Sequence, residues 1–510
     1  MSKTSPPEVG YSEFSRLLER SAPRLFLTGI GGSQGKNAVE GLVSGSSGRL
    51  SYAAGGCRYN DDGFRKNQDY YREVFDAYIQ YAATNNTSVQ FELSRGHKRF
   101  GDVELDFSPA SFSVSARNDV TQDSGRLGLH FTPSSSQHIL LSAVRAKRSE
   151  RFIDGKPGVD DLLIAIHGDS TQIEAQYLSQ TKVNLIAGMG YTRLNADRRI
   201  IFTDYVDPFT FESNEKIIRE ENNAYGYGIG RIGRRITLTA GLSYNAVRNS
   251  PNTFDRLSPK FGIRWEPMDT FSIRAAAFQS VKRNLTQNQT VEPTQIAGFN
   301  QFYDDTPGTR SINYGIGFDA KPNRNVFTGF EVSQRKLDIP VLLVNPDDGS
   351  TAFPVERATE QLARVYVYWI VSSPLTVSFE PTFEAFKRSD IADPDDTRPS
   401  EVITFRAPLT GRLAFENGFF ASTSIQPIRQ KVDRLVGQST SLNSGTDVFT
   451  VVDATFGWRL PKRYGVLSIE GRNLTDQEFY FRDENFRRAE TTPSSLQPYR
   501  SFWARLSLYF

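Results

Sequence analysis

The sequence predicts an all-β chain that folds as a transmembrane antiparallel β-barrel of roughly 22 strands. Three observations support this fold class. Segments in which apolar and polar residues alternate recur along most of the 510 residues. Short and long connections between these segments also alternate, as in barrels with turns on one rim and loops on the other. No run of about 18 apolar residues is present, so no transmembrane helix is predicted.

The last segment shows the alternation most clearly, because successive side chains of a strand point to opposite faces. One face of residues 498–510 is apolar and carries Phe502, Ala504, Leu506, Leu508 and Phe510. The other face is mixed and carries Trp503, Arg505, Ser507 and Tyr509. Segments 89–94, 235–243 and 326–335 repeat the pattern. It indicates one face toward lipid and one toward a polar lumen.

Counting such segments gives the predicted strands in order. They span residues 24–32, 36–46, 48–59, 69–83, 87–97, 124–132, 137–147, 171–180, 182–194, 222–232, 234–247, 257–266, 270–282, 311–320, 325–338, 360–371, 375–387, 399–415, 419–428, 448–459, 465–475 and 498–510. Gly, Pro, Asn and Asp mark tight turns at 85–86, 133–136, 180–181, 233–234, 267–269, 322–323, 373–374, 416–418 and 461–463. Long polar segments are expected at 98–123, 148–170, 195–221, 283–310, 339–359, 388–398, 429–447 and 476–497.

This alternation places both chain ends on the rim of short turns, as an even number of strands requires. Joining the last strand to the first removes the sheet edges, whose unpaired N–H and C=O groups would cost several kcal/mol each in hydrocarbon. A soluble β-propeller is the main alternative, but the sequence has no repeat of blade length.

Composition excludes several other classes. The chain has 60 basic and 58 acidic residues, which argues against a nucleic-acid binder with a basic stripe. Cys57 is the only cysteine, so an internal disulfide is impossible. The polar stretch 1–10 lacks the apolar core of a secretion signal, and we expect an upstream region to be missing.

The carboxy-terminal region resembles a known family. Residues 469–480 (IEGRNLTDQEFY) are similar to the penultimate-strand motif of TonB-dependent receptors, in which Asn-Leu precedes a polar turn and an aromatic pair. The closing residues 508–510 (LYF) resemble the signal read by the outer-membrane insertion machinery, with Phe502, Leu506, Leu508 and Phe510 as its candidate residues. The stretch 283–305, with EPTQ at 292–295 and GFNQF at 298–302, resembles a branch of these barrels fused to tetratricopeptide domains.

The resemblance covers residues 24–510 and departs from the family before them. Members normally carry an amino-terminal plug domain and a short box that engages an energy-transducing partner. Residues 1–23 are too short for either, so we expect them to be a linker or the remnant of an upstream region. The chain is truncated, or the plug is a separate polypeptide, or the barrel works open. The partners implied are outer-membrane lipid, the insertion machinery, a plug domain and a TonB-like protein, with no nucleic acid.

Signals of an enzyme are poor. His97, His130, His138 and His167 show no metal-ligand spacing, and glycines 226, 228 and 230 alternate along a strand instead of forming a phosphate loop. Acidic pairs at 304–305 and 347–348 and the run 393–396 could bind a cation, although solvated loop charge is the simpler interpretation. We therefore predict no catalytic, cofactor or metal residues.

Charged and polar residues within the strands are the better functional candidates. Arg or Lys near the middle of the lipid face costs about 2–4 kcal/mol, which favours an inward orientation. The candidates for the lumen wall are Gln90, Glu92, Arg235, Arg274, Glu331, Arg335, Arg406, Arg412, Glu470, Arg472 and Arg505. They either contact a plug and line an aqueous path, or they form neutralising pairs with no role toward a ligand.

The family resemblance implies a transport barrel of the outer membrane. Its outer loops would capture a scarce solute, such as a metal chelate or a glycan, and the barrel would conduct it to the periplasm. A passive porin, or a scaffold whose loops bind partners, is the alternative.

Overall fold

The computed structural model describes residues 23–108, 110–249, 253–344, 351–390, 398–433, 444–483 and 490–510. Almost all regular structure is β-strand. In the first part of the chain the strands are β1 (Arg24–Gly32), β2 (Asn37–Ser47), β3 (Leu50–Asp61), β4 (Tyr70–Thr84), β5 (Thr87–Phe100), β6 (Arg117–Ser134), β7 (Gln137–Lys156), β8 (Asp160–Ser179), β9 (Val183–Asp204), β10 (Phe209–Ile232), β11 (Ile236–Arg248), β12 (Phe254–Met268) and β13 (Phe271–Val281).

The second part continues the same sheet. Its strands are β16 (Arg310–Asn323), β17 (Val326–Pro340), β20 (Val355–Ile370), β21 (Leu375–Phe379), β22 (Thr382–Asp390), β23 (Glu401–Arg406), β24 (Leu409–Ala414), β25 (Phe419–Asp433), β26 (Gly445–Arg459), β27 (Gly465–Arg472) and β28 (Ser501–Tyr509). Small additional elements are η1 (Thr286–Asn288), β14 (Gln295–Ile296), β15 (Phe299–Asn300), β18 (Leu343–Val344), β19 (Thr351–Ala352) and η2 (Pro461–Arg463). In the described residues no helix has the length and apolarity needed to cross a membrane.

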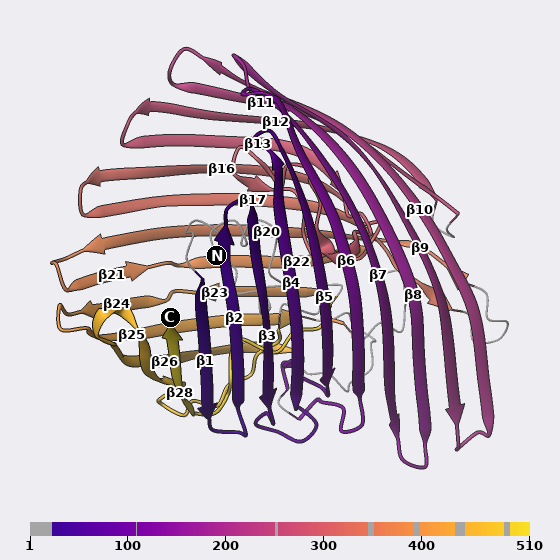
Figure 1. Cartoon of the computed structure of the whole chain (residues 1–510). Coiled ribbons are helices and arrows are strands. Elements are labelled where there is room, and N and C mark those ends of the chain that lie inside the picture. Colours follow the sequence, from indigo (N-terminus) through magenta and orange to yellow (C-terminus); the bar gives the residue numbers. More distant parts are fainter. Residues whose placement is uncertain are drawn as a thin grey trace.

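Every strand of the sheet pairs antiparallel with its neighbours along the chain, and β28 returns to pair with β1. At this seam the N–H groups of Leu25 and Phe510 each donate to the carbonyl of the other residue, at 2.9 and 2.8 Å. The start of β1 and the end of β28 therefore lie side by side on the rim that carries the short turns (Figure 1). The closed antiparallel barrel that the sequence predicts is confirmed.

Two predicted strands are interrupted. β21 and β22 form one strand that breaks at Pro381, and β23 and β24 form another that breaks at Pro408. Proline cannot donate to the ladder. The carbonyls of Pro381 and Pro408 still accept bonds from Val365 and Glu380, at 3.0 and 3.1 Å, so the wall stays continuous. Counted in this way, the sheet of 24 segments is a barrel of 22 strands.

The two faces of the wall differ as the alternation predicts. In β8, Ile173 and Tyr177 are 53% and 39% exposed, whereas the alternating residues Gln172, Glu174 and Gln176 are almost fully buried. Apolar side chains thus cover the outside of the barrel and polar ones its inside, the reverse of a soluble protein. The ring of exposed apolar residues on the outer wall fits contact with lipid.

Two of the long polar connections were predicted wrongly. Segments 148–170 and 195–221 are mostly strand, because β7 to β10 continue far beyond the expected ends and meet in turns at 157–159 and 205–208. Segment 98–123 is a connection between residues 101 and 116, and its ends belong to β5 and β6. Figure 1 shows β7 to β10 reaching past their neighbours. Between the apolar band and the long-loop rim, the outer face of these strands is charged and carries ion pairs such as Arg145–Asp169 and Arg193–Glu220. The alternation of apolar and polar residues that marks a strand is therefore absent from this part of the sequence.

Candidate functional site: the barrel lumen

The connection between β13 and β16, residues 282–309, folds into the barrel and is called here the inner loop. It contains η1 and the small hairpin β14–β15. Ile296 is fully buried and Phe299 is 5% exposed, and both pack on Tyr225, Tyr227 and other wall side chains. Burying side chains of this size stabilises a structure by about 1.5–3 kcal/mol each. The inner loop is therefore held against the wall and is not a solvated surface loop.

Glycines in the wall make room for this contact. A Cβ atom on Gly315 of β16 would collide with the ring of Phe299, and one on Gly262 of β12 would lie 2.8 Å from the Cβ of Ala297. Larger residues at these two positions would push the inner loop away from the sheet.

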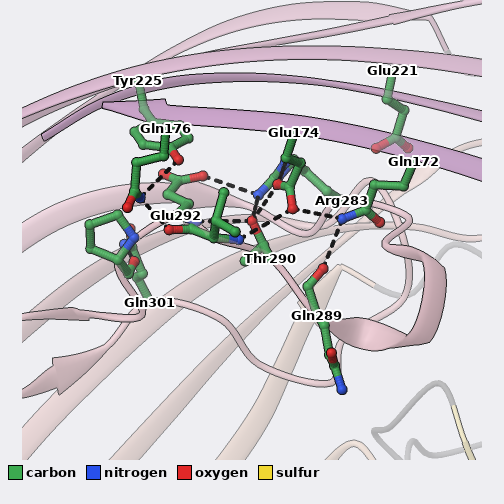
Figure 2. A network of polar contacts seen from close by, with 12 residues as sticks. Gln172, Glu174, Gln176, Glu221, Tyr225, Arg283, Gln289, Thr290, Glu292 and Gln301 are labelled. Carbon is green, nitrogen blue, oxygen red and sulfur yellow. Dashed lines mark hydrogen bonds and ion pairs between the residues drawn. The ribbon is translucent and has the colours of Figure 1, made fainter. Parts of the chain in front are cut away.

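A buried polar network anchors the amino-terminal half of the inner loop to β8 (Figure 2). The guanidinium of Arg283 lies 3.4 Å from a carboxylate oxygen of Glu174 and 3.2 Å from one of Glu292. It also donates to Thr290 Oγ1 at 2.8 Å. The side chains of the three charged residues are only 3–4% exposed. A buried ion pair by itself adds little to the stability of a fold. Removing one partner, however, is strongly destabilising, because the other charges stay buried without a counter-charge.

Amide and hydroxyl groups of the wall complete this network. Gln172 donates from Nε2 to the Gln289 carbonyl at 2.8 Å and accepts the Thr286 N–H, also at 2.8 Å. Glu174 accepts the Val291 N–H at 3.2 Å. The backbone of the inner loop thus satisfies part of its hydrogen bonding through the wall, as a buried segment must.

Contacts with β10 and β12 fix the second half. Tyr227 donates to a Glu292 oxygen at 2.5 Å, and Gln301 Nε2 donates to the Tyr227 hydroxyl at 3.2 Å. Lys260, 4% exposed, donates to Gln301 Oε1 at 2.7 Å. These bonds connect the inner loop to two more points of the wall, Tyr227 and Lys260.

The end of the inner loop reaches β17. Arg335 pairs with Asp305 and with Glu360 of β20, the latter at 2.5 Å. Its guanidinium also lies 3.6 Å from the ring centre of Tyr303, which is a favourable cation–π arrangement. Because Arg126 of β6 donates to Gln287 at 3.0 Å, the inner loop spans from β6 to β17 inside the barrel.

A second group of loops packs inside the long-loop rim. Phe479 and Phe481 from the connection before β28 and Leu105 from the connection before β6 form an apolar cluster with the wall. The rings of Phe449 and Phe479 stack with their centres 4.1 Å apart. Asn473, 1% exposed, begins this connection with a positive φ of 47°, which explains an asparagine in the Asn-Leu motif. These contacts give the turn after the Asn-Leu motif a packing role.

Glu490 of the same connection is fixed by two cations. Lys98 Nζ lies 3.0 Å from one of its oxygens and Arg148 3.1 Å from the other. Burial would raise the pKa of Glu490, but these two charges outweigh it and hold the pKa at about 2. The carboxylate is therefore charged at any physiological pH.

The space left between these loops and the wall is a cavity of about 1010 Å³. Its lining comes from β4 to β7 on one side, β17 to β23 on the other, and the inner loop between them. Both signs of charge face it, including Arg72, Glu92, Arg335, Glu360 and Glu490. The cavity can therefore accommodate a charged or strongly polar small molecule.

The candidates selected from the sequence are distributed over this wall. Glu92, Glu331 and Arg335 line the cavity. Arg274 pairs with Glu331 at 2.5 Å, and its guanidinium lies 4.7 Å from the ring centre of Phe299. Gln90 accepts a bond from Tyr78.

The remaining candidates lie away from the cavity lining. Glu470 and Arg505 face each other at 3.7 Å, and Arg472 pairs with Asp453 at 2.8 Å. Arg406 contacts the ring of Phe481, and Arg412 lies in β24. Arg235 lies in the turn before β11, where it donates to the Pro267 carbonyl. Among the predicted residues, the structure thus brings together two pairs, Arg274–Glu331 and Glu470–Arg505.

Sequence reasoning missed the anchors of the inner loop, Glu174, Lys260, Arg283 and Glu292. The alternation of Gln172, Glu174 and Gln176 with Ile173 and Ala175 was a usable signal, because it places three polar groups on the lumen face. The acidic pair 304–305 is not a solvated patch, since Asp305 binds Arg335 and Asp304 lies 3.8 Å from Lys282. The acidic groups at 347–348 and 393–396 lie outside the described residues.

Comparison with known proteins identifies the family. The family model described as "TonB dependent receptor-like, beta-barrel" matches residues 58–338, more than half of the chain. The chain belongs to the TonB-dependent receptors. No curated protein sequence matches it. Members of this family are transport receptors of the outer membrane and not enzymes, which agrees with the prediction from the sequence.

Solved structures show the same fold at low sequence identity. The copper transporter OprC is 12% identical with a TM-score of 0.71, over 96% of this chain and 80% of that one. The ferric citrate transporter FecA is also 12% identical with a TM-score of 0.71, over 96% and 78%. The ferric yersiniabactin uptake receptor FyuA from Yersinia pestis is 13% identical with a TM-score of 0.70, over 96% and 80%. TonB-dependent receptors work with TonB and a plug, so the family implies both partners.

Proposed function

We propose that this barrel takes up a scarce metal chelate from outside the cell and passes it to the periplasm. The observation that carries the proposal is the charged cavity between the inner loop and the wall of β17 to β23. Its volume of about 1010 Å³ suits a small-molecule ligand. Carboxylates and guanidinium groups on its surface can make charge-assisted hydrogen bonds to the polar groups of a chelate.

The structural relatives support a metal-containing solute over a glycan. OprC is a transporter of copper, FecA of ferric citrate and FyuA of ferric yersiniabactin. A glycan remains the alternative within the same mechanism, and aromatic side chains such as Phe302 and Tyr303 in the cavity would be its binding surface.

The proposal includes partners. A plug domain would contact the inward charges of the wall, among them Glu92 and Arg274, and a TonB-like protein would supply energy. Phe502, Leu506 and Phe510 are exposed on the outer wall at β28, where the insertion machinery could reach them. Leu508 shares their face by alternation.

Uptake by living cells tests the proposal. A strain that lacks the gene, complemented with the full-length gene, should accumulate a radiolabelled iron or copper chelate, and a protonophore should abolish the uptake. Uptake that survives the protonophore and extends to unrelated small solutes would establish the passive porin instead. Accumulation of a labelled oligosaccharide in place of any chelate would establish the glycan.

A pair of adjacent variants tests the cavity itself. Ser333 lines the cavity, whereas Val332 is 45% exposed on the outer wall. Ser333→Trp should narrow the cavity and reduce uptake severalfold, while Val332→Trp should leave uptake unchanged. Equal uptake by both variants would show that the solute does not pass through this cavity.

A further inference from the structure

Two histidines that no part of the transport proposal uses lie together on the lumen face. His130 of β6 and His138 of β7 flank the turn that joins these strands on the short-turn rim. Arg126, four residues before His130 on the same face, bonds to Gln287 of the inner loop at 3.0 Å. By alternation His130 therefore points into the barrel.

One ring nitrogen of each imidazole lies close to a ring nitrogen of the other. His130 Nε2 and His138 Nδ1 are 3.1 Å apart, and the rings are stacked with their centres 5.3 Å apart. Thr132 Oγ1 lies 3.4 Å from the same His130 nitrogen. Two imidazole nitrogens bound tetrahedrally to one ion at about 2.0–2.1 Å each would be about 3.3 Å apart. The observed spacing of 3.1 Å is therefore close to the separation that two imidazoles sharing one ion require.

We propose that His130 and His138 form a binding site for one divalent transition-metal ion, of the class Cu²⁺, Ni²⁺ or Zn²⁺. Neutral imidazole is a preferred ligand of these ions and a poor one for Mg²⁺ or Ca²⁺. In the described part of the chain, no group of three or more His, Cys, Asp or Glu residues could hold a metal. The remaining positions would therefore be filled by Thr132, water or groups of a solute, and the ion would exchange readily. The site does not depend on which solute the barrel carries.

A hydrogen bond between the two rings, without any metal, is the competing explanation. The other two histidines provide a matched control, because His97 bonds to Asp119 at 3.1 Å and His167 to Ser149 at 3.0 Å, toward the long-loop ends of β5 and β8. Both lack a second imidazole partner in these contacts.

Equilibrium dialysis of the detergent-solubilised protein, purified without a polyhistidine tag, tests the site. Metal analysis should find one bound Cu²⁺ per chain, with Ni²⁺ and Zn²⁺ competing and Mg²⁺ not competing. His130→Asn/His138→Asn should weaken the affinity by at least about tenfold, since a coordination site without its ligands is lost. His97→Asn/His167→Asn should bind as the wild type does.

Two results would overturn the proposal: absence of bound transition metal in the wild type, or equal affinity in the two double variants. Heat-modifiable gel mobility verifies that each variant is folded. Should the first double variant not fold, the single variant His138→Gln must show the same loss, and retention of full affinity there would also refute the site.

Discussion

Replacing Arg283 by alanine should release the inner loop from the wall. The side chain makes two ion pairs and one hydrogen bond, and Glu174 and Glu292 are each 3% exposed. The variant leaves these carboxylates buried without their cation, which costs about 3–5 kcal/mol. If this energy is lost from the docked state alone, the population of undocked loop rises by roughly two to four orders of magnitude.

Limited proteolysis with chymotrypsin measures this population. Phe299, Phe302 and Tyr303 are cleavage sites within the inner loop, and cutting there divides the chain into two large fragments. Trypsin is unsuitable, because the substitution itself removes a trypsin site. When opening is fast relative to cleavage, the cleavage rate follows the equilibrium population of the open form.

The control is Arg248→Ala. Arg248 binds Asp255 at 2.7 Å, but both side chains are about half exposed, so the loss should be about 0–1 kcal/mol. Arg283→Lys keeps the charge without the planar fork and should fall between the two. A cleavage rate for Arg283→Ala that stays close to that of the wild type would refute the idea that this network holds the inner loop.

Three further predictions concern the wall and the loops above it. Gly315→Val should undock Phe299 at about 1–3 kcal/mol and open the same chymotrypsin site, whereas Gly226→Val, with free space at its Cβ, should not. Phe91→Arg should lower the free energy of unfolding in lipid vesicles by about 2–4 kcal/mol, because Phe91 lies on the apolar outer band. Its control, Thr121→Arg, lies in the charged region toward the long-loop rim and should change this free energy by about 0–1 kcal/mol. Because the pKa of Glu490 in the folded protein is about 2, below its ordinary value of 4.5, its ion pairs stabilise the fold above pH 4.5 and stop doing so as the pH falls toward 2. Glu490→Gln should therefore lower the thermal midpoint at pH 6 and have no effect near pH 2, and a constant difference across that range would contradict the assignment.

The barrel was predictable because its wall obeys a local rule. In β8 the alternation of Ile173 with Gln172 and Glu174 is visible in the sequence and reflects the contrast between lipid and lumen. The rule fails where that contrast ends. Between the apolar band and the long-loop rim, the outer face of β7 to β10 meets water instead of lipid. Charged residues such as Arg145 and Asp169 on that face therefore have the sequence pattern of a loop.

The lumen was less predictable for a different reason. That Arg283 binds Glu174 depends on the fold of the inner loop, which joins residues 109 positions apart. The likeness at 283–305 pointed to this stretch, but no local pattern shows whether a polar loop turns inward or outward. Residues such as Arg274 and Glu331 were predictable one by one, because the alternation places each of them on the lumen face, but their ion pair was not.

The way the sheet closes has a consequence for how the chain acquires its shape. Each pairing joins strands adjacent along the chain, except at the seam, where Thr28 meets Ser507 across a separation of 479 residues. Closing so long a span adds little entropy beyond a span half its length, about 0.6 kcal/mol. The sheet can thus form by successive pairing of strands that are neighbours in the sequence. The pairing of β1 with β28 is the one step that closes the curved sheet into a barrel.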